Sequence, residues 1–167
     1  MTVLDLFCGL GGFSAAFRAR GHRVVGVDLV PPADVIGDVR RLPVDWKPDV
    51  VLASPPCTQF SRKAMKCFTG WNGVPSMELM NSALTVIEDL KPEWWIIENV
   101  GGARPFMPVS SQRIGSRWFW GEFPLVLHEG HGIGHGKWHL SSTASRERSR
   151  IPYRISELIC EAMEAAS

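Results

Sequence analysis

Cys57 stands in a sequence context that suits a nucleophilic thiol. It follows two prolines at the end of an apolar run, in the stretch Ser54-Pro55-Pro56-Cys57. Because proline fixes the backbone and has no N–H group, we expect the thiol to be held on a stiff turn. A nucleophilic thiol also needs an electropositive setting, which three nearby cations would provide: Arg62, Lys63 and Lys66. The alternative is a buried, inert cysteine, the usual state of a single cysteine in a folded protein.

Glu98 is the second residue with an evident chemical use. It follows the apolar run Trp94–Ile97, which we expect to be a buried strand. Burial raises the pKa of a carboxyl group and favours its protonated form. A protonated carboxyl beside a ring nitrogen can donate a hydrogen bond and stabilise the charge that develops as a thiolate adds to the ring. The alternative is a carboxylate that caps the next turn.

A glycine-rich stretch, residues 8–12, follows the first apolar run of the chain. Gly9, Gly11 and Gly12 would let the backbone pass close to a bound nucleoside or amino-acid group. Asp28 comes 19 positions after Gly9, near the spacing of about 20 expected for an acid that reaches a ribose hydroxyl. This pattern alone fits a nicotinamide cofactor as well as S-adenosylmethionine, and an ordinary tight turn is the alternative.

The elements that must position these residues alternate between short apolar runs and helical segments. We expect strands at 3–7, 24–27, 35–36, 50–53 and 94–97, and helices at 13–21, 76–90 and 155–166. Such alternation indicates an α/β fold, with a mostly parallel sheet covered by helices on both faces. We expect Trp118–Trp120 and Leu125–Leu127 to form a terminal antiparallel hairpin. The candidate residues then lie just past strand ends, where open parallel sheets bind ligands.

Bulk composition narrows the class of protein. The 167 residues suit one domain, spanning 1–167, and the net charge of +1 gives no global basic field. We recognise no signal peptide and no apolar run of the roughly 18 residues that a membrane span needs. Four cysteines without CxxC pairing suit a reducing compartment. We therefore expect a cytoplasmic protein, or one in the host-cell cytoplasm if a phage encodes it, acting as a monomer or homodimer.

Five segments together resemble the cytosine-C5 DNA methyltransferase family. They occur in that family's order along residues 5–100: Asp5–Ser14, Asp28, Gly37–Val39, Pro55–Ser61 and Glu98–Val100. The resemblance implies the Rossmann-like methyltransferase fold and S-adenosylmethionine as cofactor. It places cofactor contacts at Asp5, Phe7, Gly9, Gly11, Gly12, Phe13, Asp28, Leu29, Asp38, Val39 and Pro55.

The resemblance also implies a mechanism. The Cys57 thiolate adds to C6 of cytosine, Glu98 contacts the N3 edge, and C5 then takes the methyl group. An arginine approaches the cytosine O2, and both Arg113 and Arg117 fit its motif; we prefer Arg117, directly before the expected strand. Duplex DNA containing cytosine is the expected partner, with contacts from Ser61, Arg62, Lys63, Lys66 and Asn99. A target cytosine in a duplex must leave the base stack to reach Cys57.

The final part of the chain departs from the family pattern. Residues 145–152 echo the last motif, whose helix completes the cofactor site, but Ser149 stands near the place of an expected asparagine. Only residues 122–145 stand in place of the family's target-recognition region, too few for a domain of their own. Sequence selectivity is then low, or recognition comes from the 62–71 loop, from a protein partner, or from a smaller substrate.

Several alternatives remain beside DNA methylation. The same chemistry would serve a free cytidine nucleotide or RNA, and an inactive chain would serve as an S-adenosylmethionine-binding regulatory subunit. A nicotinamide-dependent oxidoreductase shares the sheet but has no role for Cys57 or Glu98. Four histidines between residues 128 and 139 invite a metal, but the glycines among them disfavour a helix that would align them. We expect no metal there.

Overall fold

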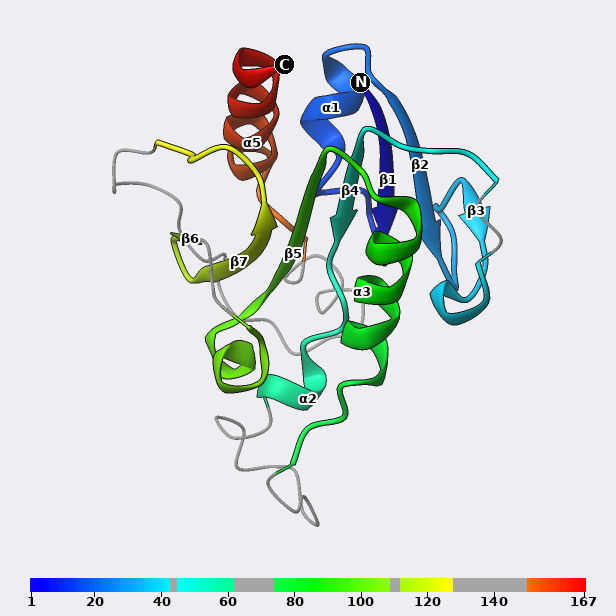
Figure 1. Cartoon of the computed structure of the whole chain (residues 1–167), viewed down its shortest axis with the longest axis vertical. Helices are drawn as coiled ribbons and strands as arrows, with labels where there is room; N and C mark the ends of the chain where they lie inside the picture. The colour runs from blue at the N-terminus through cyan, green and yellow to red at the C-terminus, as the bar shows by residue number, and fades with distance from the viewer. Residues whose placement is uncertain (43–44, 62–73, 109–111, 128–149) are drawn as a thin grey trace.

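The computed structural model describes residues 1–42, 45–61, 74–108, 112–127 and 150–167. Within them a seven-stranded sheet has the order β3-β2-β1-β4-β5-β7-β6 (Figure 1). The strands are β1 Thr2–Leu6, β2 Arg23–Asp28, β3 Val35–Ile36, β4 Val50–Ala53, β5 Trp94–Val100, β6 Gln112–Ile114 and β7 Arg117–Glu122. The α-helices are α1 Ala15–Ala19, α2 Thr58–Ser61, α3 Glu78–Leu90 and α5 Tyr153–Ala166, with 3-10 turns η1 Val39–Arg41 and η2 Gly101–Phe106.

The sheet is mostly parallel. Strands β1 to β5 pair in parallel with their neighbours, whereas β7 runs antiparallel to β5 and β6 antiparallel to β7. The central strand β4 is buried at all four positions, as expected for a strand covered on both faces. The expected Rossmann-like α/β fold is confirmed.

Each face of the sheet is covered by different helices. Along β4, Val50 and Leu52 belong to the cluster that includes residues of α1 and α5, while Val51 and Ala53 pack with α3. This alternation follows from the two-residue period of a strand. Figure 1 shows α1 beside α5, with α3 in front of the sheet. The C-terminal helix is therefore packed against the N-terminal part of the chain.

The terminal hairpin exists, but one of its expected strands was wrong. β7 pairs with β6, not with Leu125–Leu127. Gly115 (φ +62°) lies in the two-residue turn between them, a conformation that favours glycine. The side chain of Gln112 instead binds the backbone of Val126, accepting from its N–H at 3.1 Å and donating to its carbonyl oxygen.

The end of β5 also differs from expectation. We expected a strand at 94–97 with Glu98 just beyond its end, but β5 continues to Val100. The reason is pairing with β7, in which Glu98 lies opposite Phe119 and Val100 opposite Arg117. Glu98 is thus held within a strand, and the side chain that contacts its carboxyl group, that of Arg117, comes from β7.

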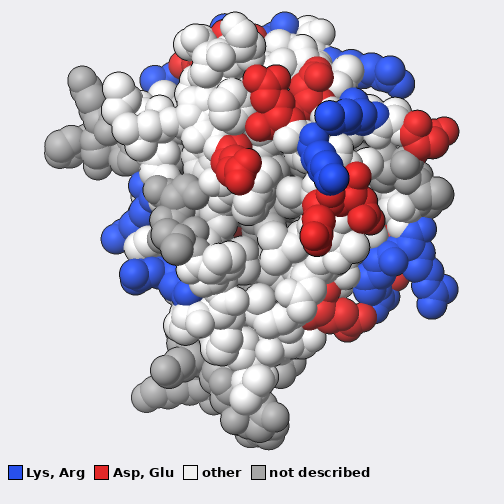
Figure 2. Space-filling model, in the orientation of Figure 1, with Lys and Arg blue, Asp and Glu red and all other residues white. Residues whose placement is uncertain are grey.

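The described surface is mixed in charge. Figure 2 shows acidic and basic side chains lying close together on the face turned to the viewer. This agrees with the net charge of +1 and indicates that binding of a polyanion would need a local patch of cations. Among the described residues, no helix is long and apolar enough to cross a membrane.

Candidate active site

The candidate residues converge on one edge of the sheet, the lower edge in Figure 1. Because the strands are parallel, β1, β2, β4 and β5 all point their carboxyl ends to this edge. Ala53 of β4 lies beside Leu6 of β1 and Ile97 of β5. The loops that leave these strands therefore begin side by side, and residues far apart in the sequence share one site.

The glycine loop after β1 is sharply bent and tied to β2. Phe7 (φ +57°), Gly9 (φ +54°) and Gly11 (φ +68°) all adopt left-handed backbone conformations. The N–H of Gly9 donates to Asp28 Oδ2 at 2.9 Å, which fixes the carboxylate at the mouth of the loop. A close backbone approach beside a fixed acid is the arrangement that a ribose-bearing cofactor requires.

Asp5 lies beneath this loop and is fully buried. Its Oδ2 accepts a 2.6 Å hydrogen bond from Ser14 Oγ. Burial raises the pKa of the Asp5 carboxyl to about 7, and the Ser14 hydrogen bond only partly offsets this. From this position Asp5 supports the loop from below, next to Ser14 at the start of α1.

The other expected cofactor residues divide by exposure. Phe7, Gly9, Gly11, Asp28 and Asp38 are half-buried and Leu29 is exposed, whereas Gly12, Phe13, Val39 and Pro55 are buried. Asp38 is held by the guanidinium of Arg40, which keeps the pKa of Asp38 at about 2. Arg40 also donates to Glu78 Oε1 at 2.7 Å, a link to α3 that sequence reasoning did not anticipate.

Cys57 lies half-buried on the turn between β4 and α2. Its carbonyl oxygen accepts hydrogen bonds from Phe60 N at 3.0 Å and Ser61 N at 2.9 Å, so the turn leads directly into α2. Asn99 Nδ2 donates to the Pro55 carbonyl at 2.9 Å and is itself buried. Asn99 thus joins β5 to the turn that carries the thiol, and its expected contact with the substrate stays a prediction.

A tight backbone contact supports the same turn from η2. A Cβ on Gly102 would lie 2.3 Å from the carbonyl oxygen of Phe60 in α2, so this position requires glycine. The backbone that follows Glu98 and the backbone that follows Cys57 are therefore in direct contact. The separation of thiol and carboxyl is fixed by main-chain packing.

Glu98 and Arg117 form the central ion pair of the site. Glu98 is 6% exposed, and its Oε1 accepts from Arg117 Nη1 at 2.8 Å. Burial raises the pKa of the Glu98 carboxyl, while the charge of Arg117 and its hydrogen bond oppose this. Both expected arginines are in β6 and β7, but only Arg117 is at Glu98; Arg113 is exposed, with Nε donating to the Gly115 carbonyl at 2.8 Å.

Arg117 also connects the site to the final segment of the chain. Its Nη2 donates to the carbonyl of Arg150 at 2.9 Å. A Cβ on Gly12 would lie 2.6 Å from Arg150 Cγ and 2.7 Å from the carbonyl oxygen of Ile151. The glycine loop and the last segment thus pack directly against each other.

Ser156 of α5 completes this junction. Its Oγ accepts from Ala16 N at 3.0 Å and donates to the Phe13 carbonyl at 2.6 Å, so one buried hydroxyl holds the start of α1. Sequence reasoning missed Ser156, and the only available signal was a small polar residue on the apolar face of an amphipathic helix. The last helix therefore reaches the glycine loop through hydrogen bonds as well as apolar packing.

Two cations frame an aromatic ring beside the site. The guanidinium carbon of Arg104 lies 4.2 Å from the centre of the Trp118 ring, and that of Arg113 lies 5.7 Å from it. Trp118 pairs with Asn99 across the sheet, next to the Arg117–Glu98 pair. Arg104 was not among the expected site residues.

Of the expected DNA contacts, Ser61 is half-buried in α2, while Arg62, Lys63 and Lys66 lie outside the described residues.

Comparison with known proteins gives a consistent set of matches. The family model of the C-5 cytosine-specific DNA methylases matches residues 1–106. The Type II methyltransferase M.HindV of Haemophilus influenzae is 22% identical over 122 residues, covering 60% of this chain and 38% of that protein. M.HgiGI of Herpetosiphon aurantiacus is 27% identical, covering 62% of this chain and 94% of that protein.

A solved structure of a DNA modification methyltransferase encoded within an E. coli prophage is also similar. It is 24% identical with a TM-score of 0.46, covering 62% of this chain and 33% of that one. This chain thus spans little more than a third of M.HindV and about a third of the prophage protein.

Proposed function

Because the chain belongs to the C-5 cytosine-specific DNA methylase family, we propose that it methylates C5 of cytosine in DNA through a covalent bond between Cys57 and C6. The observation that carries this proposal is the joining of the Cys57 turn to the strand of Glu98. Asn99, the neighbour of Glu98, donates to the Pro55 carbonyl at 2.9 Å. A thiol on the turn after β4 and a buried carboxyl in the neighbouring strand β5 are thereby held near each other, as attack on a ring and stabilisation of that ring require.

The residues at the edge of the sheet fit S-adenosylmethionine. Gly9 and Gly11 bend the backbone around the place of the amino-acid group, and Asp28 would accept from the ribose hydroxyls. Beside Asp28, the side chains of Leu29 and Ile36 are 65% and 62% exposed. They offer an apolar surface that could cover an adenine ring. When bound, the cofactor supplies a methyl group activated by its sulfonium charge.

In the proposed reaction Cys57 makes and breaks one bond. Its thiolate adds to C6, and the electrons of the C5–C6 double bond become available at C5 for methylation. After C5 has received the methyl group its proton passes to water, and the Cys57–C6 bond breaks to restore the double bond and free the thiolate. Cys8 is a poor substitute, because burial raises the pKa of its thiol to about 12.

Glu98 stabilises the ring while the adduct exists. Burial favours its protonated form, which would donate a hydrogen bond to cytosine N3 as negative charge develops there. Arg117 holds Oε1 of the carboxyl at 2.8 Å and so directs the other oxygen toward the substrate. Arg117 is thus a positioning residue for Glu98, and we assign it, in preference to Arg113, the place beside the base.

Contacts to the DNA backbone would come from the cations near Trp118. Arg104 and Arg113 are exposed, and both contact the Trp118 ring. These contacts already restrict the two side chains, so binding a phosphate would cost less conformational entropy. Replacing both with glutamine should reduce the slope of log K against log salt by nearly two, since each phosphate contact contributes about 0.9. The expected contacts from Arg62, Lys63 and Lys66 lie outside the described residues and stay predictions.

The proposal is tested by transfer of a labelled methyl group from S-adenosylmethionine. Duplex DNA, single-stranded DNA, RNA and free cytidine nucleotides are offered in parallel, and the product is identified as 5-methylcytosine. We expect label in DNA from the unmodified protein and none from Cys57→Ser. The control is Ser82→Ala, in an exposed part of α3, which should retain transfer.

Other outcomes would change the proposal in defined ways. Label only in RNA or nucleotides would keep the chemistry and replace the substrate. Cofactor binding without label in any substrate would identify a regulatory subunit or a requirement for a partner that supplies target recognition. Transfer that survives in Cys57→Ser would refute the covalent mechanism.

A further inference from the structure

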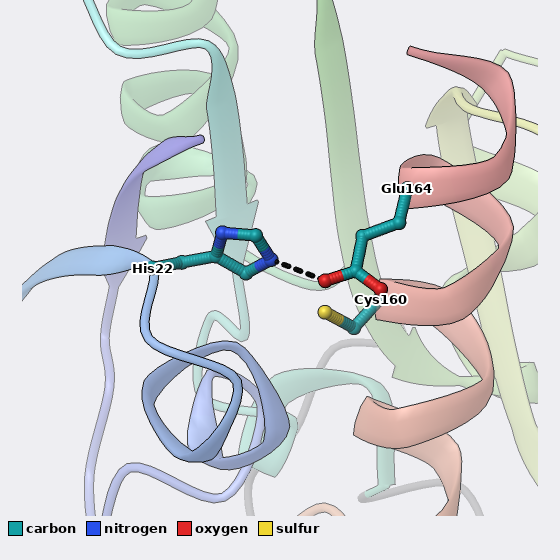
Figure 3. A group of neighbouring side chains, drawn as sticks. All are labelled: His22, Cys160 and Glu164. Atoms are coloured by element: carbon teal, nitrogen blue, oxygen red, sulfur yellow. Dashed lines mark hydrogen bonds and ion pairs between the residues drawn. The ribbon is translucent and has the colours of Figure 1, made fainter.

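Three potential metal ligands meet at the edge of the sheet opposite Cys57. His22 lies in the turn between α1 and β2, and Cys160 and Glu164 lie one turn apart on α5. The ligand atoms of the three side chains, one nitrogen, one sulfur and one oxygen, all lie within 4.8 Å of one another. Figure 3 shows the imidazole, the thiol and the carboxylate pointing toward one another across the gap between the two elements.

This group is separate from the candidate active site. His22 comes before β2, at the amino ends of the parallel strands, whereas Cys57 and the glycine loop follow the carboxyl ends. It also differs from the histidines at 128–139, at which the sequence analysis expects no metal and which lie outside the described residues. Nothing in the proposed methyl transfer uses these three side chains.

The carboxylate of Glu164 is already oriented for one ligand. Its Oε1 lies 2.8 Å from His22 Nε2, while Oε2 accepts from Arg20 Nε at 2.9 Å. A carboxylate held on one oxygen by a second-shell donor presents the other oxygen in a fixed direction. Arg20 Nη1 also lies 3.7 Å from Glu161 Oε1, so Arg20 forms ion pairs with both Glu161 and Glu164.

The chemistry of the three side chains also suits a divalent cation. Cys160 is fully buried at the centre of the group. A thiolate and a carboxylate carry two negative charges and a neutral imidazole carries none, so together they balance the charge of a divalent ion. The side chains of His22 and Glu164 remain 14% and 28% exposed, which leaves an approach from solvent.

We propose that His22, Cys160 and Glu164 bind a zinc ion, with water as the fourth ligand. Zinc accepts this combination of nitrogen, sulfur and oxygen ligands in a tetrahedral arrangement. On binding, zinc–nitrogen, zinc–sulfur and zinc–oxygen bonds form, the thiol proton is released to solvent, and any proton on Nε2 leaves that atom. The ion would join α5 to the turn before β2 and so stabilise the packing of the last helix.

Cobalt(II) titration of metal-stripped protein tests the proposal. A tetrahedral cobalt–thiolate site absorbs in the near ultraviolet through sulfur-to-metal charge transfer, and it shows visible bands from the metal. We expect both signals to saturate at one equivalent and zinc to displace them. Zinc should also raise the melting temperature of the unmodified protein.

Variants identify the site against others in the chain. His22→Gln should weaken cobalt binding at least tenfold and abolish the effect of zinc on melting. Cys160→Ser should remove the charge-transfer band, and Cys57→Ser should keep it. Because Cys160 is buried and replacing it can unfold the protein, the variant of the half-buried His22, His22→Gln, decides the assignment. Circular dichroism in metal-free buffer checks that this variant is folded.

Two results would overturn the proposal. One is the absence of a charge-transfer band at one equivalent in the unmodified protein. The other is a band that persists at full strength in His22→Gln, which would assign the metal to other residues. Either result would leave the His22–Glu164 contact as a hydrogen bond that only holds α5 to the turn before β2.

Discussion

The two parts of the chain on either side of residue 109 contribute different things to the site. Residues up to 106 carry the glycine loop, Cys57 and Glu98, and this is the part that the family model matches. The part after residue 111 carries Arg117 and Ser156, which bind groups of the first part. Reactive groups are thus concentrated in one part, and much of what fixes their position lies in the other. Loss of a contact from the second part should disturb the site without removing any reactive group.

The largest effect on this arrangement is expected from Arg117→Met. The substitution leaves Glu98 buried without its cation, and breaking a buried pair in this way costs about 3 kcal/mol of unfolding free energy. The pKa of Glu98, already raised by burial, rises further when the opposing charge is lost. The deficit should therefore be small at low pH, where Glu98 is protonated in both proteins, and grow as the pH rises.

The measurement is chemical denaturation of both proteins at several pH values, with Arg113→Met as the matched control. Arg113 is exposed at the hairpin, so its variant should stay within about 0.5 kcal/mol of the parent. Methyl transfer by Arg117→Met should fall on the order of 10²-fold, since Glu98 loses its orientation. Equal stability losses in the two variants would contradict the role assigned to Arg117.

A smaller effect is expected where the two parts touch through backbone. In Gly12→Ala the new methyl group would lie 2.6 Å from Arg150 Cγ and 2.7 Å from the Ile151 carbonyl oxygen, so the last segment must move. Overpacking of this kind costs about 1–3 kcal/mol. Gly37→Ala is the control, because its Cβ would have Val35 Cγ1 at 3.9 Å as its nearest neighbour.

Cofactor affinity separates the two contributions of Gly12. If the last segment completes the cofactor site, S-adenosylhomocysteine should bind Gly12→Ala more weakly than expected from stability alone, as calorimetry at a temperature well below melting would show. Unchanged affinity and stability would mean that the last segment shifts at no cost and holds nothing in place.

The smallest effect is expected from Ser156→Ala. It removes the acceptor of Ala16 N–H and one donor to the Phe13 carbonyl, leaving buried backbone groups unpaired at a cost of about 1–2 kcal/mol. Ser82→Ala is a matched control, because Ser82 Oγ donates to the Glu78 carbonyl within an exposed part of α3. Ser156→Ala should lower the melting temperature more than Ser82→Ala does. The reverse order would show that α5 does not hold the start of α1.

The sequence predicts the first part of the fold well and the second part less well, for a physical reason. Buried parallel strands are continuous apolar runs, so Val50–Ala53 is recognisable without its neighbours. The prediction of the hairpin partner of β7 was wrong. The true partner, Gln112–Ile114, is short, and it forms a strand because of the glycine turn and its pairing with β7. The extension of β5 past Glu98 likewise depends on β7, which no local pattern in 94–100 reveals.

The site divides in the same way. Cys57, Glu98 and Asp28 stand out because their types and neighbours imply chemistry. Asn99, by contrast, was expected at the substrate, and its bond to the Pro55 carbonyl depends on a contact between residues 44 positions apart. Contacts of this kind follow from strand register and packing, which a sequence pattern does not specify.

The most direct test of the account is covalent trapping by duplex DNA that carries 5-fluorocytosine. With fluorine at C5 no proton can leave after methylation, so the Cys57–C6 bond cannot break. In the presence of S-adenosylmethionine we predict a denaturant-resistant complex, with a mass equal to protein plus methylated DNA. Peptide mapping should place the link at Cys57, and Cys57→Ser should form none. A protein that methylates unmodified cytosine yet forms no such complex, or a complex that survives in Cys57→Ser, would contradict the central claim.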